Sequence, residues 1–130
     1  VSQLVMPDSI QMIKTPCKGL CPVYELTLTR SGNVTLLAKE NLTLNGTYTL
    51  QLDNIQMESI ISVYEQSKFL THSDEYVMGA KDLPITYLEV KGDSIYKRIR
   101  FDKSAPEELH QLANELAKLV QSENWSSNSN

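Results

Sequence analysis

The sequence predicts a single α+β domain: one mostly antiparallel sheet with two helices packed on one of its faces. Several short segments alternate apolar and polar residues, which is the period of a half-buried strand. Two longer segments repeat their apolar residues every three or four positions, which is the period of an amphipathic helix. The predicted order is four strands, a helix, two strands and a final helix, and 130 residues suit one domain.

The first half of the chain has the two-residue period of strands. We expect strands over residues 9–15, 23–30 and 47–52, with a return strand from Val34 between the last two. Turn signals containing Gly and Asn separate these segments, because both residues tolerate positive φ. The second segment divides its residues cleanly between two faces: Tyr24, Leu26 and Leu28 on one, Glu25, Thr27 and Thr29 on the other.

A helix follows these strands. Asp53-x-x-Gln56 has the pattern of a capping box, and the apolar spacing after it predicts a helix that ends near Ser67. We expect Phe69 and Leu70 to fold back onto the core. Residues 71–83 form the least regular stretch, and long irregular connections are where function is sought first.

Strands followed by a helix occur again in the second half of the chain, without a convincing internal repeat. We expect strands over residues 85–91 and 95–101, then a helix introduced by a second capping box at Ser104-x-x-Glu107. Its apolar stripe is the clearest in the chain: Leu109, Leu112, Ala113, Leu116, Leu119 and Val120. Residues 1–125 then form one domain, and residues 126–130 form a polar tail expected to be disordered.

Composition narrows the function classes. The net charge of −4 argues against a nucleic-acid partner, whose proteins usually carry a clustered basic surface. No apolar run approaches the ~20 residues of a transmembrane helix. The sequence also lacks a Gly-rich phosphate loop, an H-E-x-x-H motif and a nucleophile elbow. We therefore predict neither catalytic residues nor a cofactor.

The chemically distinctive motif is Cys17-x-x-x-Cys21-Pro22. A disulfide needs Cα atoms within about 7 Å, whereas an extended strand would hold these positions about 13 Å apart. The chain must therefore turn, and Pro16, Gly19 and Pro22 allow this. We favour a structural disulfide, which would persist in an oxidising compartment.

Two other interpretations of the cysteines remain open. A thiol redox site is one, although the spacing is a residue longer than C-x-x-C and a strand follows instead of a helix. A metal site is the other, and it would need His72 and His110 beside Cys17 and Cys21. The histidines are far apart in the sequence, so we predict no bound metal.

A candidate binding surface comes from two regions. Tyr76 and Asp82 lie in the irregular connection, and Arg98 and Arg100 lie on the sheet face that the helices leave uncovered. Glu25, Thr27, Thr29 and Tyr96 should share that face. A mixed Tyr, Arg and Thr surface suits a partner, and it is also what an ordinary solvated sheet looks like.

Residues 13–24 are similar to the C-x-G-x-C-P-x-Y signature of an uncharacterised bacterial family, the domain of unknown function numbered 6438. The resemblance extends over residues 10–120 and includes Tyr76 and the Asp82-Leu83-Pro84 run. It implies an extracytoplasmic location, because members often carry a secretion or lipoprotein signal. It implies no known activity.

The leading hypothesis is a non-catalytic extracytoplasmic binding or interaction domain. It would be periplasmic, secreted or lipid-anchored, with the signal peptide removed and any anchor outside the given sequence. Its partner would be a protein or another component of the cell envelope. The alternative is a thiol redox or metal-handling protein that uses Cys17 and Cys21.

Overall fold

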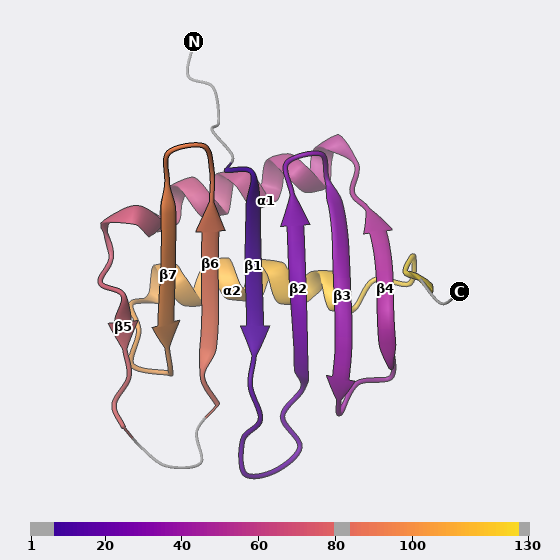
Figure 1. The fold of residues 1–130 in the computed structure, drawn as a ribbon, viewed down its shortest axis with the longest axis horizontal. Coiled ribbons are helices and arrows are strands. Elements are labelled where there is room, and N and C mark those ends of the chain that lie inside the picture. Colours follow the sequence, from indigo (N-terminus) through magenta and orange to yellow (C-terminus); the bar gives the residue numbers. More distant parts are fainter. Residues whose placement is uncertain (1–6, 80–83, 128–130) are drawn as a thin grey trace.

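The computed structural model describes residues 7–79 and 84–127 of the chain. Within them, one eight-stranded sheet has the order β5-β7-β6-β1-β2-β3-β4-β8 (Figure 1). The strands are β1 (Ser9–Lys14), β2 (Val23–Thr29), β3 (Asn33–Glu40), β4 (Gly46–Gln51), β5 (Glu75–Tyr76), β6 (Thr86–Lys91), β7 (Tyr96–Phe101) and β8 (Ser126–Ser127). The helices are α1 (Asn54–Ser67), α2 (Glu107–Val120) and the short 3-10 helix η1 (Phe69–Thr71).

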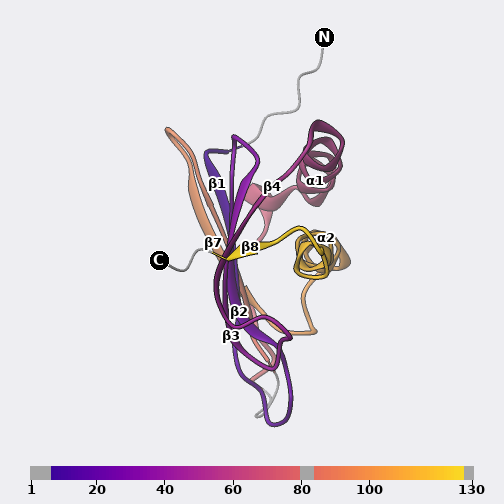
Figure 2. The same cartoon turned by 90° about the vertical axis from the view of Figure 1, so that its right-hand side faces the viewer.

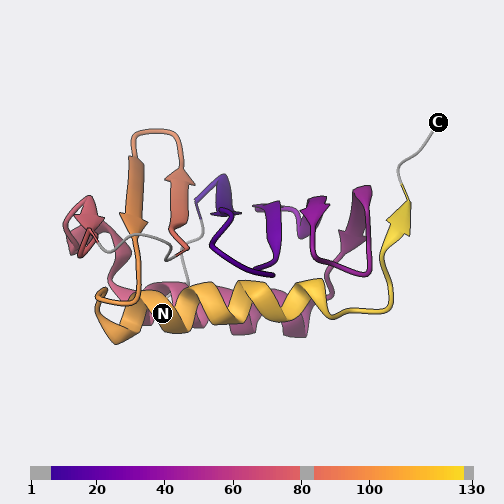
Figure 3. The same cartoon turned by 90° about the horizontal axis from the view of Figure 1, so that it is seen from below.

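The sheet grows in two directions from β1. The strands β1 to β4 form an antiparallel meander, and the β6–β7 hairpin pairs with the other edge of β1. Only one of the pairs in the described sheet is parallel, between β5 and β7. Both long helices lie on one face of the sheet (Figures 2 and 3). The predicted α+β class is confirmed, and the sheet has two more strands than the six predicted.

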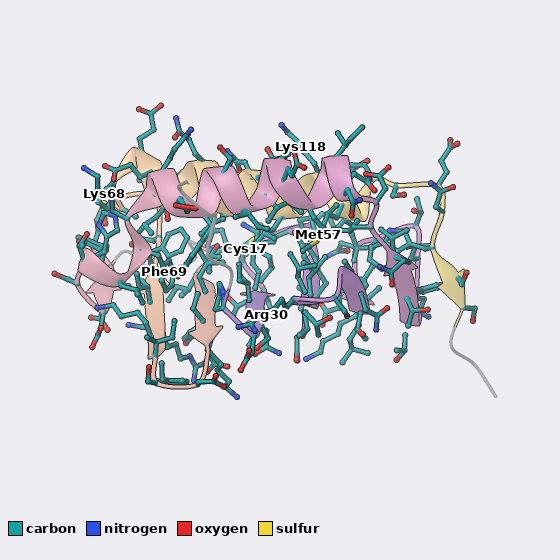
Figure 4. All side chains as sticks on the ribbon, turned by 90° about the horizontal axis from the view of Figure 1, so that it is seen from above. Cys17, Arg30, Met57, Lys68, Phe69 and Lys118 are labelled. Atoms are coloured by element: carbon teal, nitrogen blue, oxygen red, sulfur yellow. A yellow bond between two sulfur atoms is a disulfide. The ribbon has the colours of Figure 1, made fainter. Side chains whose placement is uncertain are left out.

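The core lies between the sheet and the helices. The alternation predicted for β2 is confirmed, since Tyr24, Leu26 and Leu28 are all buried. The stripe of α2 is buried as well, except that Val120 is half-buried. Met57 and Phe69 lie between the helices and the sheet, whereas Lys118 lies on the outer surface of the helix layer (Figure 4).

The first predicted capping box forms. The Gln56 amide donates to Asp53 Oδ1 (2.8 Å), and the Asp53 amide donates to Gln56 Oε1 (3.1 Å). The helix ends at Ser67 as predicted, and its C-cap Lys68 has a left-handed φ of 51° that turns the chain toward η1. Phe69 is buried as predicted, but the expectation for Leu70 was wrong, because its side chain is exposed.

The second predicted capping box does not form. Pro106 occupies the N-cap of α2 without a side-chain hydrogen bond. Ser104 instead donates both its amide (2.8 Å) and its hydroxyl (2.7 Å) to Asp102 Oδ1. In the predicted box the Ser104 hydroxyl would accept from a helix amide, but α2 begins only at Glu107, and the hydroxyl instead donates to a carboxylate, which is a strong charge-assisted hydrogen bond.

The C-terminal segment also differs from the expectation. Ser126 and Ser127 form β8, which pairs with Thr49 and Tyr48 of β4. Trp125 holds the preceding turn by donating from Nε1 to the carbonyl of Leu119 (3.0 Å). The segment expected to be disordered therefore begins with a strand, and residues 128–130 lie outside the described residues.

Candidate functional site

The four residues named as a candidate binding surface do not share one surface. Arg98 and Arg100 lie on the sheet face away from the helices, as expected. Tyr76 pairs in register with Phe101 and packs against the core, so its ring lies on the helix side of the sheet. Asp82 lies outside the described residues.

Tyr76 helps to hold the connection between α1 and β5. Its hydroxyl accepts from the Ser73 amide (3.0 Å) and lies 3.4 Å from His72 Nδ1. The other ring nitrogen of His72 donates to the carbonyl of Ser67 (2.7 Å) and lies 3.6 Å from Glu108 of α2. These contacts join the end of α1, the start of α2 and β5, which makes the role of Tyr76 in this structure a positional one.

The uncovered side of the sheet, called the open face below, presents aligned rows of side chains. Strand register sets the rows, because residues directly opposite each other on neighbouring strands are close enough to interact. One row runs Arg98, Glu89, Gln11, Thr27, Thr35 and Thr49. The next runs Arg100, Tyr87, Ile13, Glu25, Leu37 and Thr47. The β6–β7 half is thus charged and aromatic, and the β2–β4 half is rich in threonine.

Tyr87 lies between the two arginines of β7. The guanidinium carbon of Arg98 lies over its ring, 4.5 Å from the centroid, within the range of a cation–π contact. Hydrogen bonds to Tyr87 and to Glu75 raise the pKa of Arg100, and Arg100 Nη1 lies 2.9 Å from Glu75 Oε1. Sequence reasoning missed Tyr87, although its alternation with Thr86 and Leu88 placed it on this face.

The remaining charges of this half are mostly paired. Glu89 accepts from the hydroxyl of Tyr96 (2.7 Å), and this bond raises the pKa of Tyr96. Glu89 also lies 3.5 Å from Lys91. Among the residues that the structure describes, Arg98 makes no ion pair, so its planar donor group faces solvent with its orientation set by the Tyr87 ring.

The cysteines form a disulfide, with Cα atoms 5.8 Å apart. They lie in the link between β1 and β2, and a strand follows the second cysteine, so the motif does not open a helix. The histidines have other partners: His72 donates to Ser67, and His110 packs edge-on against Phe101. Over residues 7–79 and 84–127, no group of three or more His, Cys, Asp or Glu side chains could hold a metal.

A buried carboxylate escaped the sequence reasoning. Asp102 is 4% exposed and accepts hydrogen bonds from Ser104 and from the Met78 amide (2.8 Å). These bonds lower the pKa of Asp102. The Asp-x-Ser spacing after a strand was the available signal, because Asp side chains in such turns accept from the amide two residues on.

The helix side of the molecule offers a contrast. A shallow groove between α1 and α2 is lined by Ile55, Ser59, Glu115 and Lys118, among others. Glu115 accepts from Ser59 (3.1 Å) and pairs with Lys118 (3.2 Å). The charged groups named here are therefore engaged with each other.

One family model matches the chain over residues 8–120, from β1 to the end of α2. The chain belongs to the family described as Domain of unknown function (DUF6438). The matched segment of this DUF6438 domain includes both the disulfide and the open face. A comparison with curated proteins finds no match. None of the helices in the described part of the DUF6438 domain is long and apolar enough to cross a membrane.

Proposed function

We propose that this DUF6438 domain is a non-catalytic binding domain that works outside the cytoplasm and uses its open face for recognition. The observation that most directly supports this proposal is the Arg98 guanidinium, which stacks on Tyr87 and has no ion-pair partner among the described residues. Arg and Tyr are among the residue types enriched at the positions that contribute most binding energy at interfaces. A sheet also holds them in fixed positions, which reduces the entropy lost on binding.

The chemistry of this site suggests the partner. A guanidinium with free donors matches a carboxylate or phosphate group, which it can bind through two parallel hydrogen bonds. The threonine-rich half beside it supplies hydroxyl groups that both donate and accept hydrogen bonds. We therefore propose a protein or another cell-envelope component that presents an acidic group opposite Arg98.

The disulfide supports the proposed location. Disulfides persist in oxidising compartments and are rare in the cytosol. A fractionation of cells producing the full-length protein, followed by intact mass with and without reduction, tests this. We expect an oxidised protein outside the cytoplasm, and a cytoplasmic protein with free thiols would contradict the proposal.

The binding role is tested by affinity capture from the envelope fraction. Immobilised wild-type domain should retain a partner that the Arg98→Ala and Tyr87→Ala variants lose. Lys118→Ala, on the outer surface of α2, is the matched control and should retain it. Equal capture by all four proteins would refute recognition through the open face.

A thiol redox role remains the second candidate, because both cysteines of the disulfide are only half-buried, so solvent can reach the bond. Redox-active disulfides have higher potentials than structural ones, which lie below about −300 mV. A measured potential above that range, with turnover of a dithiol substrate that requires Cys17 and Cys21, would favour this candidate over the binding role.

A further inference from the structure

The loop of residues 15–22, called the cystine loop here, projects beyond the end of the sheet between β1 and β2 (Figure 1). Its disulfide adds no link between distant elements. The strands β1 and β2 already pair along their length, up to Lys14 opposite Tyr24. The Cys17–Cys21 bond therefore constrains the loop itself.

Two further contacts brace the same loop from neighbouring segments. At its start, the Thr15 hydroxyl donates to the carbonyl of Ile85 (2.8 Å) and accepts from the Ile85 amide (3.0 Å). At its end, Asn41 donates from its side-chain amide to the carbonyl of Cys21 (2.9 Å). Three separate constraints thus hold a loop of eight residues.

The part of the loop that these constraints hold contributes little to the core. Lys18, Gly19 and Leu20 are exposed. Leu20 is 87% exposed, the largest value among the large hydrophobic side chains that the structure describes. A Cβ placed on Gly19 would meet no atom within 4 Å, so the tip stands in open space. The bracing therefore constrains the backbone of a loop whose apolar Leu20 side chain the fold does not bury.

We propose that the cystine loop is a pre-organised docking element, in which Leu20 inserts into an apolar pocket of a folded protein partner. Lys18, two residues away on the same tip, would pair with an acidic group at the rim of that pocket. Pre-organisation favours binding because the loop loses little further freedom when it docks. This site goes beyond the open face, since it is formed by a different part of the chain.

A protein partner fits these observations better than a lipid surface. Stable membrane anchoring needs far more apolar surface than a single leucine, or a polybasic patch beside it. The tip offers one lysine, and the net charge of −4 opposes an anionic bilayer. A pocket, in contrast, can enclose one leucine completely, and full burial of its side chain removes that apolar surface from water, which favours binding.

The test uses the full-length protein in its native cells, with Leu20 replaced by a benzophenone-bearing amino acid. We expect light to produce one discrete protein adduct. The same group in place of Ile55, which is 79% exposed on α1, should produce none and serves as the control. An adduct yield at position 20 no greater than at position 55 would overturn the proposal.

Competition experiments then test whether formation of the adduct depends on Leu20. Added wild-type domain and Arg98→Ala should both suppress the adduct, whereas Leu20→Ser should not. The Cys17→Ser/Cys21→Ser variant should need about tenfold more protein for the same suppression, because its loop must be ordered on binding. Suppression by Leu20→Ser equal to wild type would refute the docking role. The docking role would also be refuted if no protein adduct formed and the protein instead sedimented with phosphatidylethanolamine/phosphatidylglycerol vesicles in a way that requires Leu20. Arg98→Ala reports on the open face separately.

Discussion

At the scale of single residues, Asp102 connects three segments. Its carboxylate accepts from Ser104 and Met78, its amide donates to the carbonyl of Tyr76 (3.0 Å), and its carbonyl accepts from the Ala105 amide (3.2 Å). The end of β7, the chain after β5 and the approach to α2 therefore meet at one buried acid. From the sequence alone only the Asp-x-Ser turn can be recognised, because Met78 is distant from Asp102 in the chain.

The lowered pKa of Asp102 predicts a dependence of stability on pH. A carboxyl group with a folded pKa below its unfolded value stabilises the fold above the unfolded value, near 3.8, and the stabilisation is lost as pH falls through the folded pKa. We expect Asp102→Asn to lower the melting temperature at pH 7 and to differ less from wild type at acid pH. Thermal unfolding from pH 7 down to about pH 2 measures this.

Asp93→Asn is the control for that series, since Asp93 is exposed in the β6–β7 turn. Its melting temperature should follow the wild type throughout. A constant difference between Asp102→Asn and wild type at every pH would contradict the account of Asp102.

Lys14 is a second residue with a testable effect on stability, because burying its charged group costs free energy of folding. Its ammonium group points to the helix side of β1 and donates to Thr86 Oγ1 (3.1 Å), and burial lowers its pKa. Replacing both partners by apolar residues of similar size removes the desolvation cost without leaving an unpaired polar group. We expect Lys14→Met/Thr86→Val to melt at or above the wild-type temperature near pH 7. Thr86→Val alone should melt lower, and the reverse order in calorimetry would refute this.

At the scale of elements, the disulfide of the cystine loop stabilises the folded domain, but the pairing of β1 with β2 does not depend on it. The chain-entropy model gives about 2 kcal/mol for closing a five-residue ring. We expect Cys17→Ala/Cys21→Ala to lower the free energy of unfolding by about that amount, with an unchanged far-UV circular dichroism spectrum. Urea unfolding of the reduced and oxidised wild type provides the matched comparison. Loss of the folded state on reduction would contradict the claim that β1 and β2 pair independently of the disulfide.

The helices and strands also differ in how well the sequence predicts them. The six longer strands and both helices were predictable, because their periods are local and run over six residues or more. The strands β5 and β8 have two residues each, too few for a period, and they exist through pairing with β7 and β4. The cap of α2 was mispredicted because Asp102 competes for Ser104.

At the scale of the whole molecule, both long helices cover one side of the sheet and leave the open face uncovered. The face of Arg98 and Arg100 was predictable from alternation within β7. The stacking of Arg98 on Tyr87 was not, because it depends on the register between β6 and β7. Tyr76 was expected in an irregular connection, because the two-residue strand β5 that places its ring on the helix side is too short to show a period in the sequence.

The most direct test of recognition through the open face is hydroxyl-radical footprinting of the domain, free and with its captured partner. Tyr87 and Tyr96 lie on the β6–β7 half of that face, and Ile55 lies on the helix side. We predict that the partner lowers the labelling of Tyr87 and Tyr96 and leaves that of Ile55 unchanged. Protection of Ile55 with Tyr87 and Tyr96 labelled as in the free domain would contradict the proposed function.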